Sequence, residues 1–161
     1  MDTDTDMYHA FPQVKGRAVH ASVDAKQTSG KSSIIESLNV VSHKYGLMGK
    51  IDVLDCSTGR LTERKNNLKH IFQGQIYQLW AQYLCLEEMG YTVKSLFFYE
   101  VSTKRHISIH FPDTCGLTLF ENLLQEYRAF NPREFGFQNQ NKCLHCIYCG
   151  LCDKSTFENV Y

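Results

Sequence analysis

Gly49-Lys-Ile-Asp-Val-Leu-Asp55 and, a short turn later, Leu61-Thr-Glu-Arg-Lys65 set the architecture of this chain. Both segments mix apolar residues with alternating polar ones, which predicts two strands. Ser57-Thr-Gly59 lies between them and predicts a tight turn. The two strands are therefore expected to form a hairpin, with Glu63 and Lys65 on one face of the second strand.

Polar residues inside these strands carry the chemistry. Alternation places Lys50, Asp52 and Leu54 on one face of the first strand, so Asp52 is an acid within an apolar β sequence. An Asp on one strand and Glu63-x-Lys65 on its partner supply two carboxylates, which suit Mg²⁺ or Mn²⁺ because these ions prefer oxygen ligands. The lysine can then orient an attacking water and offset charge on a phosphate. The plain alternative is a surface hairpin that carries these side chains by chance.

The hydrophobic pattern elsewhere predicts an α/β fold, with a mixed central sheet flanked by helices. Apolar residues recur at helical spacing from Phe72 onward, and Gly90 ends that segment. Asn131-Pro132 closes a second amphipathic segment, and the polar residues 133–141 predict a loop. The expected helices are 15–26, 72–90 and 117–127, and the expected strands are 38–41, 47–56, 60–65, 93–101 and 105–111.

Bulk composition excludes several classes of protein. The chain has 161 residues, 43% of them hydrophobic, which predicts a single domain, residues 1–161, around one core. Its 17 basic and 17 acidic side chains cancel, which argues against a broadly basic surface but leaves room for a local basic groove. No apolar run approaches membrane-spanning length, and the acidic start is unlike a secretory signal. We therefore expect no membrane association and a cytoplasmic location.

Four cysteines lie within ten residues near the C-terminus: Cys143, Cys146, Cys149 and Cys152. Thiolates at this spacing converge without long loop closure, so residues 142–153 predict an iron–sulfur or soft-metal site. Zinc also accepts four thiolates, but familiar zinc sites place two Cys-x2-Cys pairs far apart. Disulfides and free thiols are the remaining alternatives. The other cysteines are expected to be small core residues: Cys56, Cys85 and Cys115.

Two further segments carry candidate site residues. Gly16-Arg-Ala-Val-His20 opens the first expected helix and could present His20 to the same metal. Gln78 and Tyr83 lie on the long helix that follows the hairpin. Each has an ordinary alternative, because a lone histidine is more often a plain surface or core residue, and Gln78, Gln82 and Tyr83 are common helix and core residues.

Taken in order, these motifs resemble the RecB-type nucleases of the PD-(D/E)XK superfamily, and within it the CRISPR-associated Cas-four exonucleases. The resemblance spans roughly residues 8 to 153 and is closest to members from type V systems. It is carried by Gly-x-x-x-His20, Gly49-Lys-Ile-Asp52, Thr62-Glu-Arg-Lys65, Gln78-Leu-Trp-Ala-Gln-Tyr83, Cys85-Leu-Glu-Glu-Met-Gly90 and the clustered cysteines.

The resemblance implies a PD-(D/E)XK nuclease core and a function in CRISPR adaptation. Proteins of this family trim single-stranded overhangs of prespacers beside the CRISPR integrase complex. By this resemblance His20, Asp52 and Glu63 are ligands of Mn²⁺ or Mg²⁺, and Lys65 is the catalytic lysine. Gln78 and Tyr83 support the site or contact DNA.

The resemblance also implies that the cysteines hold a 4Fe–4S cluster, with Cys143, Cys146 and Cys152 at the family's three C-terminal positions. The family's first ligand comes from an N-terminal Cys-Pro-Arg motif, whereas this sequence has no cysteine before Cys56. Cys149 is an addition to the pattern. It is expected to be either a substitute for the missing ligand or a bystander.

Because net charge is zero, DNA binding is expected to be local. The groups expected to line the approach to the metal are Arg64, Lys65, Lys69 and Lys15 or Arg17, with Tyr77 or Tyr83 nearby. Two other functions stay open. One is a nuclease-inactive DNA-binding or assembly subunit of the adaptation complex. The other is a small zinc- or iron–sulfur-binding module unrelated to nucleases.

Overall fold

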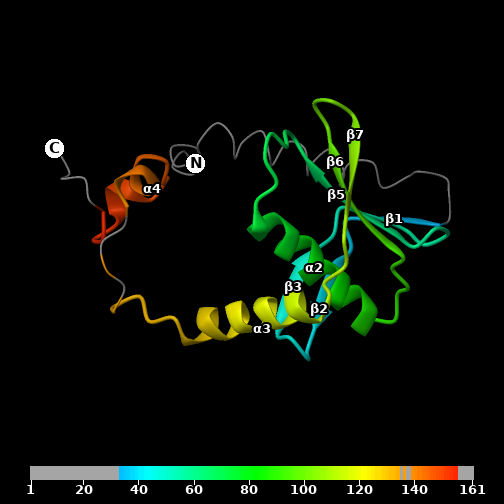
Figure 1. The fold of residues 1–161 in the computed structure, drawn as a ribbon, viewed down its shortest axis with the longest axis horizontal. Helices are drawn as coiled ribbons and strands as arrows, with labels where there is room; N and C mark the ends of the chain where they lie inside the picture. The colour runs from blue at the N-terminus through cyan, green and yellow to red at the C-terminus, as the bar shows by residue number, and fades with distance from the viewer. Residues whose placement is uncertain (1–32, 135, 137–138, 156–161) are drawn as a thin grey trace, which may run out of the picture.

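A mixed five-stranded sheet forms the centre of the molecule, and helix α2 packs across one of its faces (Figure 1). The computed structural model describes residues 33–134, 136 and 139–155. The strands lie in the order β1-β4-β5-β6-β7. Their bounds are Ile34–Glu36 (β1), Val53–Asp55 (β4), Arg60–Lys65 (β5), Ser95–Glu100 (β6) and Arg105–Ile109 (β7). The predicted α/β fold with a mixed sheet is confirmed.

The hairpin of β4 and β5 follows the sequence prediction, and β5 has the predicted bounds. Its turn depends on Gly59, whose φ of 69° is in the left-handed region that favours glycine. The Gly59 N–H donates to the Asp55 carbonyl at 2.8 Å. A Cβ atom at this position would lie 2.9 Å from Lys94 Cγ, so the turn also needs the missing side chain.

Helix α2, Gln73–Glu88, carries the chain from β5 to β6. These two strands are parallel, and a parallel pair requires a crossover connection of this kind. Gly90 follows the helix with a φ of 88°, as its sequence position predicts. The predicted hairpin of β6 and β7 is also present and turns through Lys104, which has a φ of 58°.

One predicted strand is wrong. Residues 47–56 do not form one strand, because the chain leaves extended pairing at Ile51 and Asp52. Both residues are buried, with exposed fractions of 0% and 5%, so the inside–outside alternation of a strand fails there. The part before the break joins a separate two-stranded sheet of β2, Asn39–Ser42, and β3, Leu47–Lys50. Strand β1 was not expected from the sequence.

The core lies between the large sheet, α2 and the small sheet. Alternation along β5 and β6 turns Leu61, Leu96 and Phe98 toward α2, which contributes Leu79 and Leu86. All five side chains are 0% exposed. Burial of this apolar surface is the main force that holds α2 against the sheet.

Helix α3, Thr114–Ala129, begins earlier than the predicted segment 117–127. Asp113 caps it by accepting the Gly116 N–H at 2.7 Å. Gly116 allows a close approach to α2, because a Cβ atom there would lie 2.9 Å from the Trp80 ring. Phe120 is the one residue of α3 that is buried.

The cysteine-rich segment lies apart from the sheet, beyond the end of α3 (Figure 1). It contains α4, Gln140–Leu144, and a 3₁₀ turn, η1, Cys149–Leu151. Of the three cysteines expected in the core, Cys85 is buried, but Cys56 and Cys115 are exposed and that expectation is wrong for both. Each of these two lies next to a surface turn or helix start, where apolar neighbours in sequence do not imply burial.

Some sequence predictions lie outside the described residues. These are the helix at 15–26 and the candidate residues Lys15, Arg17 and His20. Within the described part of the chain, no helix has both the length and the apolar character that a membrane crossing requires.

Candidate functional site

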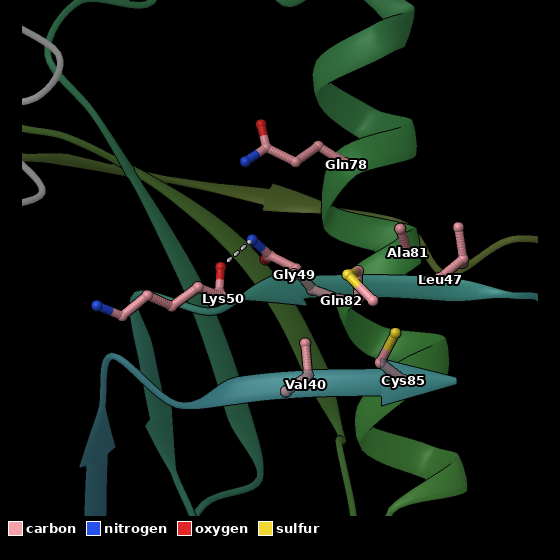
Figure 2. Close-up of a pocket in the computed structure, with 9 residues that line it drawn as sticks. Val40, Leu47, Gly49, Lys50, Gln78, Ala81, Gln82 and Cys85 are labelled. Atoms are coloured by element: carbon pink, nitrogen blue, oxygen red, sulfur yellow. Dashed lines mark hydrogen bonds between the residues drawn. The ribbon is translucent and has the colours of Figure 1, made fainter. Parts of the chain in front are cut away.

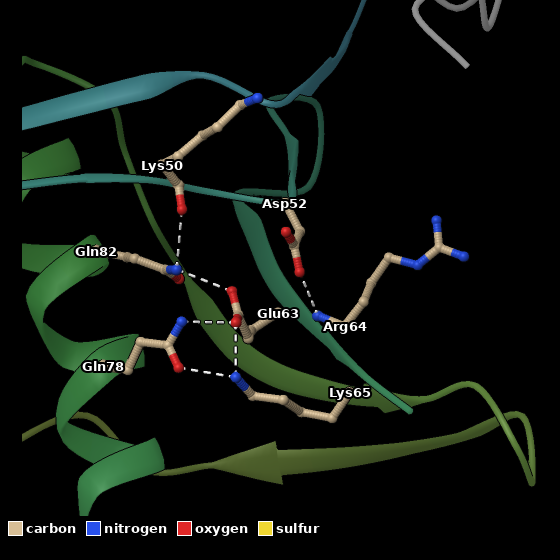
Figure 3. A network of polar contacts seen from close by, with 7 residues as sticks. All are labelled: Lys50, Asp52, Glu63, Arg64, Lys65, Gln78 and Gln82. Atoms are coloured by element: carbon tan, nitrogen blue, oxygen red, sulfur yellow. Dashed lines mark hydrogen bonds and ion pairs between the residues drawn. The ribbon is translucent and has the colours of Figure 1, made fainter. Parts of the chain in front are cut away.

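Glu63 is the centre of a buried polar network between β5 and α2 (Figure 3). Its side chain is 0% exposed. Oε1 accepts hydrogen bonds from Lys65 Nζ at 2.8 Å and Gln78 Nε2 at 2.7 Å. Oε2 accepts a third from Gln82 Nε2 at 2.8 Å. A buried carboxylate needs such donors, because an uncompensated charge in the interior is costly.

Lys65 and Gln78 bind each other as well as Glu63. Lys65 Nζ donates to Gln78 Oε1 at 2.8 Å, and Gln78 Nε2 donates to Glu63. The Gln78 amide therefore contacts both members of the Lys65–Glu63 ion pair. The Lys65 side chain is 18% exposed, and Gln78 lies at the surface. An ammonium has three N–H donors, and these contacts use two of them. Within the described residues the third makes no hydrogen bond, so a ligand that approaches from solvent could accept it.

Asp52 lies beside this network, just before β4. Its Oδ2 accepts the backbone N–H of Arg64 at 2.7 Å (Figure 3). In the β4–β5 ladder Val53 pairs with Thr62, so one further step of the same register would set Asp52 opposite Glu63. The two carboxylates therefore come from neighbouring positions of adjacent strands, as the sequence predicts. If β4 were longer, one of its backbone carbonyls would accept the Arg64 N–H. The carboxylate of Asp52 accepts it instead.

Gln82 is a member of this network that sequence reasoning treated as an ordinary helix residue. It is 5% exposed, and its Nε2 also donates to the Lys50 carbonyl at 3.3 Å. The available signal was its spacing, because Gln78 and Gln82 are four residues apart and share a helix face. Its Oε1 is buried and has no hydrogen-bond partner among the described residues.

Tyr83 and Tyr77 lie elsewhere. Tyr83 packs against Phe111, with ring centroids 4.9 Å apart, and desolvation by burial raises the pKa of its hydroxyl above 10.0. Tyr77 packs against Trp80 and Phe120 at 5.5 and 5.3 Å. Neither tyrosine is hydrogen-bonded to the Glu63 network in the described structure. Both are core-packing residues of α2.

The basic residues predicted around the metal are divided between two faces. Lys65 belongs to the network, and Lys69 is exposed after the end of β5. The Arg64 side chain points away from Glu63 (Figure 3), because adjacent residues of a strand lie on opposite faces. The expectation that Arg64 lines the approach to Glu63 is therefore wrong.

The oxygen donors present suit a hard divalent cation in kind. Asp52 and Glu63 are carboxylates, and Gln82 Oε1 is a buried oxygen that accepts no hydrogen bond from the described residues. Within the described residues, no three His, Cys, Asp or Glu side chains are grouped so that they could hold one metal ion. A pair of carboxylates is nevertheless a common protein contribution to Mg²⁺, which keeps several waters.

A cavity of about 270 Å³ opens beside the network, between the small sheet and α2 (Figure 2). Gln78 and Gln82 form its polar side, and the Lys50 carbonyl lies next to them. The other lining residues are Val40, Leu47, Met48, Gly49, Ala81 and Cys85. Burial raises the pKa of the Cys85 thiol to about 11, so this cysteine is a neutral, apolar wall residue near pH 7.

The four C-terminal cysteines surround a second cavity. It has a volume of about 160 Å³ and is lined by Lys142, Cys143, Cys146, Cys149, Cys152 and Ser155. Three successive turns position the thiols, because the N–H groups of residues 146, 149 and 152 donate to the carbonyls of residues 143, 146 and 149 at 3.1, 3.2 and 3.3 Å. Turns of three residues eclipse every third side chain, so all four cysteines lie on one side of the segment.

Cys149 shares this side with the three cysteines at the family positions. Its Sγ lies 3.0 Å from Ser155 Oγ. Cys143 is buried, Cys146 is exposed, and Cys149 and Cys152 are intermediate. Thiols around one cavity fit an iron–sulfur cluster in donor type and number, whereas the described arrangement does not group three of them around a single ion.

Comparison with known proteins gives a likeness in fold. The sequence matches no protein-family profile and no curated protein. Its structure is similar to a solved structure described as "Crystal structure of SSO0001", with a TM-score of 0.55 and 15% sequence identity. The match covers 92% of this chain and 73% of that chain. At this identity the similarity concerns the fold alone.

Proposed function

We propose that this chain is a divalent-metal-dependent nuclease with a PD-(D/E)XK core that degrades single-stranded DNA from its ends. The observation that carries the proposal is the network in which buried Glu63 is bonded to Lys65, Gln78 and Gln82, with Asp52 on the adjacent strand position. Two carboxylates and a lysine at one end of a strand pair are the groups that metal-assisted phosphodiester hydrolysis needs.

Asp52 and Glu63 would hold Mn²⁺ or Mg²⁺, with His20 as a further ligand from outside the described residues. When bound, the ion supplies a Lewis acid and lowers the pKa of a coordinated water. The chain's own residues hold the Lys65 ammonium in position. Glu63 holds Lys65 in place, and Gln78 fixes the ammonium from its other side. The remaining N–H of Lys65 then points to the phosphate or the attacking water and offsets negative charge in the transition state.

The resemblance to Cas-four exonucleases adds a substrate and a partner to the proposal. Under it, the substrates are single-stranded overhangs of prespacers, and the partner is the CRISPR integrase complex. A nuclease-inactive subunit that binds DNA in the same complex is the competing function. The two differ in one measurable property, metal-dependent loss of DNA.

The lysine provides the first test. Lys65→Ala removes the charge that faces the phosphate, so degradation of end-labelled single-stranded DNA with Mn²⁺ is expected to fall about a hundredfold or more. Lys94→Ala, at an exposed lysine before β6, is the matched control and should degrade DNA like the wild type. Equal rates for both variants, with both folded by circular dichroism, would remove Lys65 from the mechanism.

We also propose that the C-terminal cysteines hold a 4Fe–4S cluster. The support is the shared cavity of four thiols, and the role of Cys149 follows from its place in that cavity. Because Cys149 lines the same cavity as the other three cysteines, we assign it as the fourth ligand.

Anaerobic purification and absorption spectroscopy test this. The protein is expected to be brown, and Cys149→Ser should bleach it as fully as Cys143→Ser does. Cys56→Ser is the control, because Cys56 is exposed and lies outside the segment. Retention of colour in Cys149→Ser would make Cys149 a bystander, and a colourless protein containing one zinc would replace the cluster by zinc.

A further inference from the structure

The face of the large sheet opposite α2 carries arginines and aromatic rings. Arg60, Thr62 and Arg64 lie on the other side of β5 from Glu63, because successive strand residues alternate. We call this surface the outer face; it comprises Val53, Asp55, Arg60, Thr62, Arg64, Phe97, Tyr99 and His106. Seven of these, all but Phe97, line an open groove of about 370 Å³.

Among the described residues, the two arginines of the outer face contact aromatic rings and have no acidic partner. Arg60 lies over the Phe97 ring, 3.8 Å from its centroid, and its Nη2 is 2.9 Å from His106 Nδ1. The Arg64 guanidinium lies 5.8 Å from the Tyr99 ring centroid. Within the described part of the chain, neither guanidinium makes an ion pair, and the Nε of each lacks a hydrogen-bond partner. An anion that reaches the outer face would therefore meet the Nη groups and not the buried Nε atoms, with no ion-paired carboxylate among the described residues in competition.

The one acid in the groove is already engaged. Asp55 Oδ1 accepts the Ser57 N–H at 2.9 Å and the Ser57 hydroxyl at 2.6 Å. The hydroxyl bond is the main reason that the pKa of Asp55 lies below 3.8. This carboxylate stabilises the turn before β5 and makes no ion pair with Arg60, its cross-strand neighbour.

The rings add a stacking surface to the positive charge. Tyr99 and His106 pair across β6 and β7, with ring centroids 4.8 Å apart. Single-stranded nucleic acid is recognised by this combination, in which cations follow the phosphates and aromatic rings stack on unpaired bases. A duplex keeps its bases stacked inside and cannot use the rings.

We propose that the outer face binds a single strand of DNA, with Arg60 and Arg64 at phosphates and a base stacked on Tyr99. The choice of DNA rests on the proposed function, whereas the binding chemistry does not. The outer face is linked to the Glu63 network through β5, since the Arg64 N–H holds Asp52 while its guanidinium lies on the outer face. β4 pairs with β5 only as far as Thr62. Beyond Thr62, on the β4 side of β5, no strand of that pair lies between the Glu63 network and the outer face.

Fluorescence anisotropy of a labelled oligothymidylate, measured on the full chain in EDTA, tests the proposal. Tyr99→Ala is expected to weaken binding at least about fivefold, the effect of losing one stacked base. Tyr127→Ala is the matched control, because Tyr127 is an exposed tyrosine of α3 and should bind like the wild type. Tyr99→Phe keeps the ring and should retain binding.

Salt dependence separates the roles of the arginines and the tyrosine. Arg60→Ala and Arg64→Ala should each reduce the slope of log affinity against log salt by about 0.7, the value for one phosphate of a single strand. Tyr99→Ala should leave that slope unchanged. Arg133→Ala, at an exposed arginine after α3, is the control for charge alone.

Three results would overturn the proposal. They are no binding by the wild type in EDTA, equal binding by the outer-face variants and their controls, and binding of a phosphopeptide or duplex in preference to the single strand. Unfolding midpoints confirm that each variant is folded. Because EDTA excludes hydrolysis, Tyr99-dependent binding without Mn²⁺-dependent degradation would refute the proposed nuclease alone, and the reverse pattern would refute the outer face alone.

Discussion

Three side-chain donors converge on one buried carboxylate, Glu63, and each donor has a different exposure. Lys65 and Gln78 lie toward solvent, whereas Gln82 is buried behind them. Lys65 and Gln78 can leave Glu63 to bind a ligand, because water can replace the hydrogen bonds that they give up. Gln82 is only 5% exposed, so its amide has less access to water and its bond to Glu63 is the least readily exchanged of the three.

Gln82 therefore provides a prediction about stability. Gln82→Ala leaves Glu63 Oε2 buried without a donor, which should lower the free energy of unfolding by about 1–3 kcal/mol. Gln125→Ala, at an exposed glutamine of α3, should change it by less than about 0.5 kcal/mol. Urea unfolding in EDTA measures both. A Gln82→Ala variant as stable as Gln125→Ala would mean that water reaches Oε2.

At this scale the alternation of the strand placed Glu63 and Lys65 on one face, and the structure brings Gln78 to the same carboxylate, while the roles of these residues stay predictions. A strand period of two places Glu63 and Lys65 together and should also have placed Arg64 on the opposite face. Tyr83 was assigned through the family motif, whereas a helix turn of 3.6 residues puts it on a different side of α2 from Gln78. The role that the motif assigns to Tyr83 stays a prediction.

At the scale of elements, the end of β6 is held by one carboxylate. Glu100 is 2% exposed, and its Oε1 accepts the Leu68 N–H at 2.7 Å. Its Oε2 accepts from the Thr103 hydroxyl and from Arg105 Nη2 at 2.8 Å. Glu100 thus ties β6 to the segment after β5 and to the β6–β7 turn.

These bonds, led by the one from Thr103, lower the pKa of Glu100 from 4.5 to about 2. A carboxyl whose pKa is depressed in the folded state contributes stability above its unfolded pKa and loses it as pH falls toward the folded value. The thermal midpoint of the wild type should therefore exceed that of Glu100→Gln near neutral pH, and the difference should shrink between about pH 4.5 and about pH 2.

Glu126→Gln is the control for this pH dependence, because Glu126 is exposed on α3. Its midpoint should follow the wild type throughout the titration. A difference between wild type and Glu100→Gln that stays constant with pH would show that Glu100 acts through shape and not through charge.

Element boundaries were predicted where local signals agree. β5, α2 and the β6–β7 hairpin have turn or glycine signals at their ends, and the structure has them close to the predicted places. The break at Ile51 and Asp52 has no such signal. It arises because two neighbouring residues are buried by different parts of the fold, which a local pattern does not record.

At the scale of the whole molecule, one strand connects two surfaces with different chemistry. The side of β5 toward α2 carries Glu63 and Lys65, and the outer face carries Arg60 and Arg64. Zero net charge is compatible with this division, because Asp52 and Glu63 are buried while neither Arg60 nor Arg64 makes an ion pair within the described residues. The mixed sheet was predictable from the order of strands and helices, whereas the neighbours of each face across the strands needed the register.

The measurement that tests the nuclease most directly is degradation of end-labelled single-stranded DNA by the wild type and by Asp52→Asn, each with Mn²⁺ and with EDTA. Asparagine keeps an oxygen that can accept the Arg64 N–H, so this change removes the charge and spares the fold. The wild type should degrade DNA only with Mn²⁺, and Asp52→Asn should be at least about a hundredfold slower. Equal degradation by Asp52→Asn, or intact DNA after incubation of the wild type with Mn²⁺, would contradict the proposed nuclease.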